Sequence, residues 1–233
     1  MKRTLSVLGL VLVSAPAFSQ VLPSVSDADA NGRDIVHLGA LDTGQMYMKA
    51  DCTRELTRGA KCTVFEPQPR FTSFNHLDIV SFRIPARAAN SLLCFDITPL
   101  IQVDFANATG IPTSFGLFSA TATLTIKNPV LNDLIRPDGQ PYNGKFDIHT
   151  IQFSEQVTLA ANEATGKSYH FTRSCGTASV SKHALTRFYG LTPAQATNFF
   201  NNPITVVLNA RADVSYVDQL LYQYHVRLYG DRR

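Results

Sequence analysis

The sequence of 233 residues contains no tryptophan, although it has 8 tyrosines and 15 phenylalanines. A sugar-binding site built on flat aromatic rings would have to use tyrosine in this chain. The candidates are Tyr222, Tyr224 and Tyr229. Aromatic residues at strand spacing more often pack in the core or across strands. We therefore expect these three tyrosines to serve packing rather than a sugar platform.

Several motifs that carry chemistry are also missing. There is no C-x-x-C spacing and no histidine close to a cysteine in sequence, which argues against a zinc site. Neither G-x-S-x-G nor H-E-x-x-H occurs. Lys and Arg are scattered rather than clustered on one stripe, so we do not expect nucleic acid as a partner.

Only the N-terminus has the pattern of a targeting segment. Lys2 and Arg3 precede the apolar run Leu5–Val13, and a triplet of small and aromatic residues, Ala17-Phe18-Ser19, follows. This order is typical of a secretory signal peptide spanning residues 1–19. The run is too short for a membrane anchor, which needs about 20 apolar residues, and no later stretch is long and apolar enough to insert into a membrane.

Cleavage after residue 19 would lower the formal net charge from +3 to +1. The sequence thus predicts a nearly neutral periplasmic or secreted protein. We expect a polar leader over residues 20–34 and a single β-sandwich domain over residues 35–233.

The four cysteines lie beyond the signal peptide, and an even number in an exported chain predicts disulfides. Three connectivities are possible. We favour Cys52 with Cys62, because the segment between them holds charged residues and Gly59, as a hairpin tip would. Cys94 and Cys175 would then join two distant strands.

Period-two alternation dominates from Ile35 onward. The clearest cases are Phe115–Ile126, whose second face is rich in threonine, and the C-terminal segments Ile204–Tyr216 and Leu221–Tyr229. A strand is also expected on each side of Pro99, and a turn-rich loop from Lys127 to Lys145. Short strands at this spacing predict an all-β fold, an antiparallel β-sandwich that is jelly-roll-like.

One region breaks the strand pattern and predicts a short two-helix insertion near residues 179–202. Thr192, Pro193 and Gln195 have the order of a capping box with proline at the first helical position, so a helix should begin there and end near Asn202. Ser181–Tyr189, which Gly190 follows, predicts a helix before it.

Residues 27–34 begin like a calcium loop. Asp27, Asp29 and Asn31 place oxygen side chains at alternate positions, and a glycine follows. The twelfth position of the loop is Leu38, so the bidentate carboxylate of an EF-hand is missing. The stretch resembles the D-x-D-x-N-G loops of calcium-binding propeller repeats, in a single copy. The alternatives are a weak Ca²⁺ site, with Ca²⁺ as cofactor, and a solvated leader in which Asp and Asn favour turns.

Two enzyme motifs occur in part. Asp42-Thr43-Gly44 is the triplet of aspartic proteases, but no second copy is present, so a turn between strands is the simpler explanation. Ser179-Val180-Ser181-Lys182 matches the S-x-x-K of penicillin-interacting enzymes without their partner motifs. A helix N-cap explains these serines without chemistry.

Asp147 and His149 lie two residues apart on an expected strand, so their side chains should point the same way. Two residues do not make a catalytic site. We therefore expect a non-enzymatic binding or structural module of the periplasm or cell surface, with a protein or glycan of the cell envelope or cell surface as partner. The alternative is a hydrolase of cell-envelope or extracellular polymers, with Asp42, Asp147 or His149 in an acid/base site.

Overall fold

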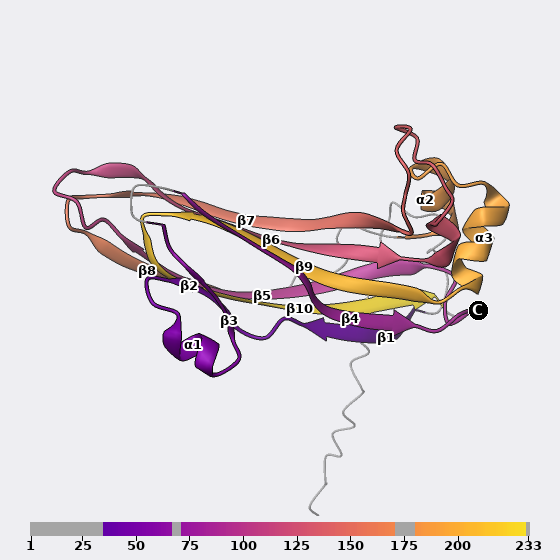
Figure 1. Cartoon of the computed structure of the whole chain (residues 1–233), viewed down its shortest axis with the longest axis horizontal. Helices are drawn as coiled ribbons and strands as arrows, with labels where there is room; N and C mark the ends of the chain where they lie inside the picture. The colour runs from indigo at the N-terminus through magenta and orange to yellow at the C-terminus, as the bar shows by residue number, and fades with distance from the viewer. Residues whose placement is uncertain (1–34, 67–70, 171–179, 232–233) are drawn as a thin grey trace, which may run out of the picture.

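The structure is a computed structural model that describes residues 35–66, 71–170 and 180–231 (Figure 1). Several predictions concern residues outside these ranges: the signal peptide, the leader with Asp27, Asp29 and Asn31, and Cys175. The calcium site and the Cys94–Cys175 link therefore remain predictions.

Strands make up most of the described chain. Their bounds are β1 (Ile35–Asp42), β2 (Met46–Lys49), β3 (Lys61–Val64), β4 (Thr72–Ile84), β5 (Leu92–Ala106), β6 (Thr113–Lys127), β7 (Lys145–Leu159), β8 (Ala164–His170), β9 (Ile204–Ser215) and β10 (Val217–Asp231). The helical segments are α1 (Thr53–Thr57), the 3-10 turn η1 (Pro129–Leu131), α2 (Lys182–Arg187) and α3 (Pro193–Asn201).

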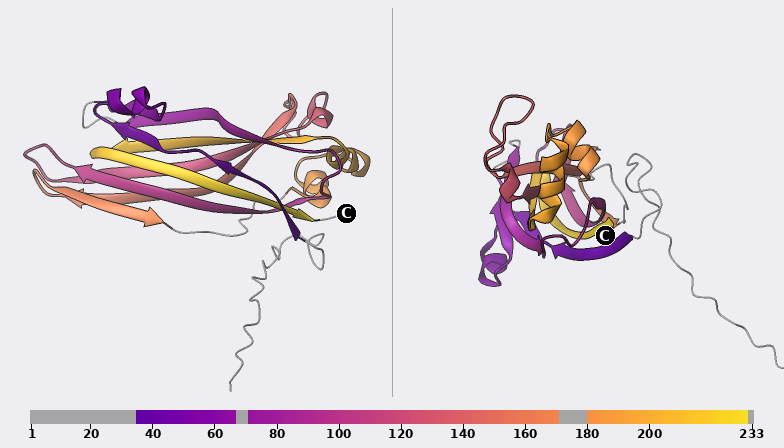
Figure 2. Two further views of the ribbon diagram at one scale, coloured as in Figure 1. Left: turned by 90° about the horizontal axis from the view of Figure 1, so that it is seen from below. Right: turned by 90° about the vertical axis from the view of Figure 1, so that its right-hand side faces the viewer.

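The strands form two sheets that pack face to face (Figure 2). Sheet A has the order β3-β2-β10-β5-β8, with β1 also paired to β10, and sheet B has the order β4-β9-β6-β7. From β3 onward the chain changes sheet at every connection except the one between β6 and β7. This alternation is the double Greek key of a jelly roll. The predicted all-β sandwich with a small helical insertion is confirmed.

The core lies between the two sheets and follows the alternation of the sequence. On β9 the residues of one face, from Ile204 to Val214, are at most 3% exposed, and Tyr222 and Tyr224 of β10 are fully buried. Tyr222 packs edge-on against Phe74 of β4, with ring centroids 5.6 Å apart. These two tyrosines are therefore core residues, as expected, while half-buried Tyr229 packs edge-on against His37.

Helices α2 and α3 lie at one end of the sandwich, beside the end of β10 (Figure 1). The capping box is present: Thr192 Oγ1 accepts from the Gln195 backbone N–H at 3.2 Å, and Gln195 Oε1 accepts from the Thr192 N–H at 2.8 Å. Ser181 caps α2 by accepting from the Ala184 N–H at 2.9 Å. The cap explanation for the S-x-x-K match is thus confirmed for Ser181.

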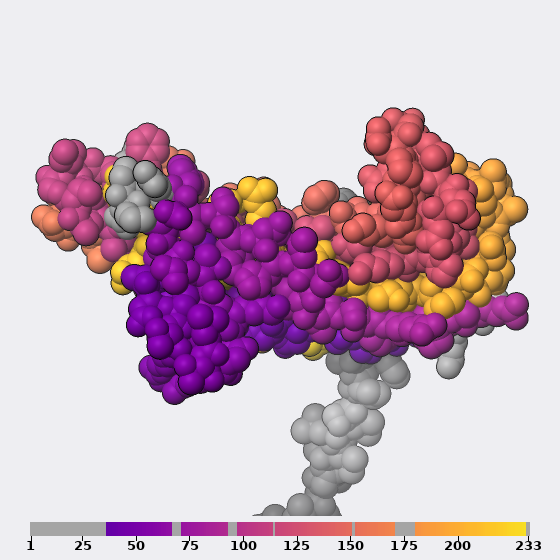
Figure 3. Space-filling view, viewed as in Figure 1, coloured from indigo at the N-terminus to yellow at the C-terminus, as the bar shows by residue number. Residues whose placement is uncertain are grey.

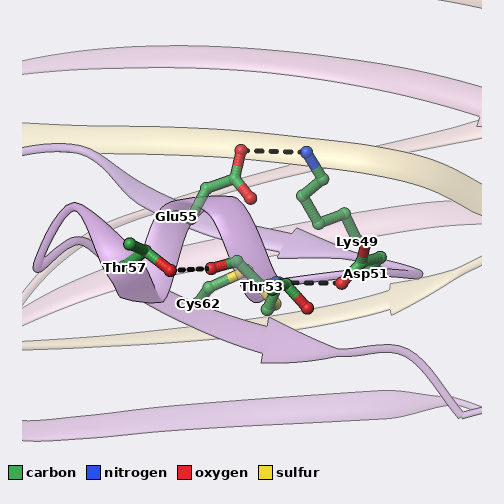
Figure 4. Close-up of a disulfide and its surroundings, with 7 residues drawn as sticks. Lys49, Asp51, Thr53, Glu55, Thr57 and Cys62 are labelled. Carbon is green, nitrogen blue, oxygen red and sulfur yellow. Dashed lines mark hydrogen bonds and ion pairs between the residues drawn. A yellow bond between two sulfur atoms is a disulfide. The ribbon is translucent and has the colours of Figure 1, made fainter.

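The disulfide Cys52–Cys62 is present, but the expected hairpin between these cysteines is wrong (Figure 4). β3 runs parallel to β2, with Met46 opposite Lys61. A parallel pair needs a connection that returns to the starting end of the strand. Helix α1 lies in that connection, so the charged segment forms a crossover rather than a tip.

The Asp42-Thr43-Gly44 triplet lies between β1 and β2, but the chain does not reverse there. Both strands pair with the same side of β10, so residues 43–45 form a bulge between them, and β2 also pairs with β3 on its other side. The Thr43 hydroxyl accepts from the Tyr224 N–H at 2.9 Å, and Gly44 has φ of +65°. Glycine adopts this left-handed backbone without the steric cost of a Cβ.

Pro99 does not divide β5, contrary to the prediction of two strands. It lies opposite Tyr224 of β10, next to Leu100, where the described pairing with β8 ends. Proline is tolerated in a strand where a neighbouring strand needs no N–H from it. Similarly, β8 covers residues 164–170 rather than the expected 168–175, whose last residues lie outside the described ranges.

Candidate functional site

The outer face of sheet B is a regular array of polar side chains. Strand register places these residues in five transverse rows across β4, β9, β6 and β7. The rows are Arg83-Thr205-Lys127-Lys145, then Ser81-Val207-Thr125-Asp147, Asn209-Thr123-His149, Asn75-Arg211-Thr121-Gln152 and Ser73-Asp213-Ser119-Ser154. None of these residues is a Phe, Tyr or Trp. Val207 is the one apolar member and is 2% exposed.

We call the first of these rows the basic row. It brings Arg83 of β4, Lys127 of β6 and Lys145 of β7 to the same end of the sheet, around Thr205 of β9. Lys127 and Lys145 are direct cross-strand neighbours. Like charges directly opposite each other destabilise an antiparallel pair.

A cleft of about 530 Å³ opens over the basic row. It is lined by Arg83, Lys127, Asn128, Pro129, Asn132, Asn143, Gly144, Lys145, Pro203 and Thr205. The connection from β6 to β7 forms one wall and stands out from the body of the protein above β9 (Figure 3). The lining residues include three cations and no carboxylate. The cleft can therefore attract an anionic group.

Local hydrogen bonds fix the wall of the cleft. The buried Asn128 side chain accepts from the Val130 N–H at 3.0 Å and donates to the Phe199 carbonyl at 2.9 Å. It thereby ties η1 to α3. Gly144 has φ of +77°, and a Cβ there would lie 2.6 Å from Asn132 Oδ1. Only glycine permits both this backbone and this close approach.

Beside the basic row, a hydrogen-bonded chain crosses all four strands of sheet B. β4 bulges between His76 and Val80, and the Asp78 N–H donates to Asn209 Oδ1 at 2.8 Å. Asn209 Nδ2 donates to Thr125 Oγ1 at 2.9 Å, and the Thr125 hydroxyl donates to Asp147 Oδ1 at 2.5 Å. Asn209 and Thr125 are 7% and 8% exposed. This chain holds the second row rigid next to the cleft.

Asp147 and His149 point to the same side of β7, as expected. Both are exposed on the outer face of sheet B, whereas the intervening Ile148 is buried. Neither residue lines the cleft, which begins one row away. The sequence thus placed these two side chains on the correct face, without identifying the cleft beside them.

Asp42 lies on the other sheet, at the end of β1, so it does not join Asp147 and His149. Its carboxylate accepts from the Gly44 N–H at 2.7 Å and from Gln223 Nε2 at 3.0 Å, and it lies 3.5 Å from His225 Nδ1. Partial burial raises the pKa of Asp42, but these hydrogen bonds outweigh it and lower the pKa below its ordinary value. Asp42 is thus held as a carboxylate.

A second cleft, of about 380 Å³, lies between the β1–β2 bulge and the connection from α1 to β3. It is lined by Thr43, Gly44, Gln45, Tyr47, Glu55, Arg58, Gly59, Ala60 and Lys61. The hydrogen bond from Lys49 Nζ, at 3.0 Å, lowers the pKa of Glu55 (Figure 4). This ion pair neutralises the acid, and the cleft has mixed charge rather than one sign.

The basic row was missed because its members are far apart in sequence. The lysines and Arg83 looked scattered, and only strand register brings them together. The sequence contained one weak signal. Arg83 and Lys127 are each followed by a proline two residues later, and Thr205 is preceded by a proline two residues earlier. Such prolines mark strand ends, so these polar residues belong to one end of a sheet.

The described residues show no metal centre. They contain no group of three or more His, Cys, Asp or Glu side chains that could hold a metal ion. Across the same residues, no helix has the length and apolar content to span a membrane. The disulfide itself fits a protein of the periplasm or the extracellular space, where thiols are oxidised.

Comparison with known proteins identifies no family. No protein family model matches the chain, and no curated protein matches it. Among solved structures, the T13 particle of IBDV is 9% identical with a TM-score of 0.17, covering 84% of this chain and 38% of that chain. The T=1 particles of infectious bursal virus are 11% identical with a TM-score of 0.17, over 94% and 44%. The chain thus spans less than half of each viral chain, and likeness at this level carries no argument.

Proposed function

We propose that the protein is an exported, non-enzymatic binding module that attaches to a hydroxyl-rich polymer, a glycan of the cell envelope or cell surface. The observation that carries the proposal is the outer face of sheet B, where polar side chains fill five rows and a cleft opens at one end. Hydroxyl and amide groups in such an array can exchange hydrogen bonds with water for hydrogen bonds with sugar hydroxyls.

A glycan suits this face better than a protein partner does. The energy of protein interfaces comes mostly from buried aromatic, arginine and other large side chains at the centre of the patch. The centre of this face instead carries Thr121, Thr123 and Gln152, and its apolar Val207 is already buried. The arginine in the same row, Arg211, is ion-paired with Asp213 at 3.1 Å. The predicted signal peptide and the disulfide support export to the periplasm or cell surface.

A hydrolase of envelope polymers is the second candidate, because Asp147 and His149 share the same face. The Asp147 carboxylate, however, already accepts a hydrogen bond from Thr125, and neither residue lines the cleft. Analysis of polymer length after incubation with the protein separates the two candidates. The binding module leaves the chain length unchanged, whereas a hydrolase shortens it.

The test of the binding face is depletion of the protein from solution by insoluble polysaccharide from cell envelopes. Thr121 and Gln152 are cross-strand neighbours on the face, and the variant Thr121→Val with Gln152→Ala removes their hydrogen-bonding groups while keeping a β-branched residue on β6. The control, Gln102→Ala, changes an exposed glutamine on β5 of sheet A.

We expect the double variant to lose most of the bound fraction and the control to keep it. Equal retention of wild type and double variant on the polysaccharide would place binding elsewhere and reject the proposal.

A further inference from the structure

We infer that the cleft over the basic row binds the oxyanion of an acidic glycan, a carboxylate or a phosphate group. The inference rests on the proposed function, because the neutral part of the same ligand would lie along the other rows of the face. It adds the chemical class of ligand and the residues that select it: Arg83, Lys127 and Lys145.

The first argument is charge without compensation. Arg83 and Lys145 are exposed and have no carboxylate within ion-pair distance among the described residues. Lys127 Nζ lies 3.2 Å from Asp78 Oδ1, but the Asp78 side chain is 70% exposed, so this pair is solvent-screened and weak. An arriving oxyanion can therefore recruit all three cations at small cost.

The second argument is geometry. The basic row spans the four strands of the sheet, and its outer strands lie about 14 Å apart at ordinary strand spacing. Long side chains from both edges can converge on a group above Thr205. The Arg83 guanidinium can bind a carboxylate or phosphate with two parallel hydrogen bonds. Side chains of Thr205, Asn132 and Asn143 line the same space.

The third argument concerns the rest of the ligand. Moving along the strands from the basic row, the face carries Asp147 in the second row and Asp213 in the fifth. The five rows together cover about 27 Å of strand. A densely charged polyanion such as nucleic acid would be repelled by Asp147 beside the cleft, and these rows contain no Phe, Tyr or Trp for base stacking. Asp213 is ion-paired with Arg211 on the same face, with Nε and Oδ2 3.1 Å apart, so this end of the face is close to neutral. A glycan with spaced acidic groups and many hydroxyls fits both parts of the face.

The test uses two oligogalacturonides of equal length, one half methyl-esterified and one fully methyl-esterified, with inorganic phosphate as a third probe. Binding to the intact exported protein is measured by titration calorimetry at low and high salt. The cleft variant is Arg83→Gln with Lys145→Gln. The matched control, Arg54→Gln with Arg227→Gln, removes the same charge from exposed positions on α1 and β10.

We expect wild type and control to bind the half-esterified probe about tenfold more tightly than the fully esterified one, a preference that the cleft variant loses. High salt and millimolar phosphate should weaken binding of the half-esterified probe only.

Equal affinity for both oligogalacturonides in wild type would overturn the inference and leave the proposed function standing. Binding of neither would contradict both. Loss of the preference in the control as well would show net charge, not the cleft, to be responsible, and would also overturn the inference.

Discussion

The two outer faces of the sandwich arrange their charges in different ways. On sheet A, Asp42 lies opposite His225 and also accepts from Gln223, so an acid faces groups that stabilise it. On sheet B, Lys127 lies opposite Lys145, and Arg83 lies on the same row. The first arrangement lowers the energy of the folded state, whereas the second raises it.

Charges paired with opposite or hydrogen-bonding groups stabilise the fold, whereas like charges in one row do not, and this difference is a guide to function. A jelly roll needs polar side chains on its outer faces, but it does not need three cations in one row. Residues that weaken a fold at their own position are expected at functional sites. The comparison therefore supports the proposed binding role of the basic row, whereas Asp42 and its partners form an ordinary stabilising contact.

The largest expected effect is on the edge of sheet A, where the disulfide holds the α1 crossover. Replacing Cys52 and Cys62 together by serine removes a link that spans 10 residues. The loop-entropy model gives a loss of about 3 kcal/mol in the free energy of unfolding, measurable by chemical denaturation. Unchanged stability would show that sheet A does not depend on this link.

The described strands of sheet B contain no disulfide. On their outer face, the hydrogen-bonded chain through Asn209 and Thr125 connects the strands instead. Asn209→Ala removes the acceptor of the Asp78 N–H and one of the two hydrogen bonds of the Thr125 hydroxyl, which still donates to Asp147. We expect a loss of about 2 kcal/mol, because Asn209 and Thr125 are buried, and removal of the Asn209 amide leaves polar groups there with fewer hydrogen bonds. The control on sheet A, Gln223→Ala, should cost less than about 0.5 kcal/mol, since Asp42 is exposed. Equal losses would remove this difference between the faces.

The third prediction concerns pH at the seam between the sheets. Burial, together with the nearby Lys61, lowers the pKa of His76 to about 4 from 6.5. The unfolded chain therefore binds a proton at higher pH than the folded one, so stability is complete above pH 6.5 and falls as the pH drops toward 4. For this half-exposed ring, solvent screening limits the loss to about 1 kcal/mol.

Denaturation curves across this pH range, for wild type and His76→Phe, measure the effect. The variant should lack this part of the pH dependence. Identical slopes in the two proteins would assign the pH dependence to other groups.

The sequence predicted those features that depend on local periodicity. Alternation identified the buried face of β9, and the Thr192 capping box marked the start of α3. It did not predict the parallel pairing of β2 and β3 or the separation of Asp42 from Asp147, because both depend on which strands become neighbours.

The candidate site was hidden for the same reason. Arg83, Lys127 and Lys145 belong to strands whose order in the sheet differs from their order in the chain. Their side chains become neighbours only through the register with β9 and between β6 and β7. Residue spacing within one strand, which placed Asp147 beside His149, contains no information about such a row.

The most direct test of the proposed role of the basic row is Lys145→Glu, followed both by thermal unfolding and by titration with the half-esterified oligogalacturonide. The substitution replaces a repulsive cross-strand pair with an attractive one next to Lys127. We expect stability to rise by a few tenths, at most about 1 kcal/mol, while affinity for the acidic probe falls at least about tenfold. A less stable variant that keeps its affinity would contradict the account, because the basic row would then be structural.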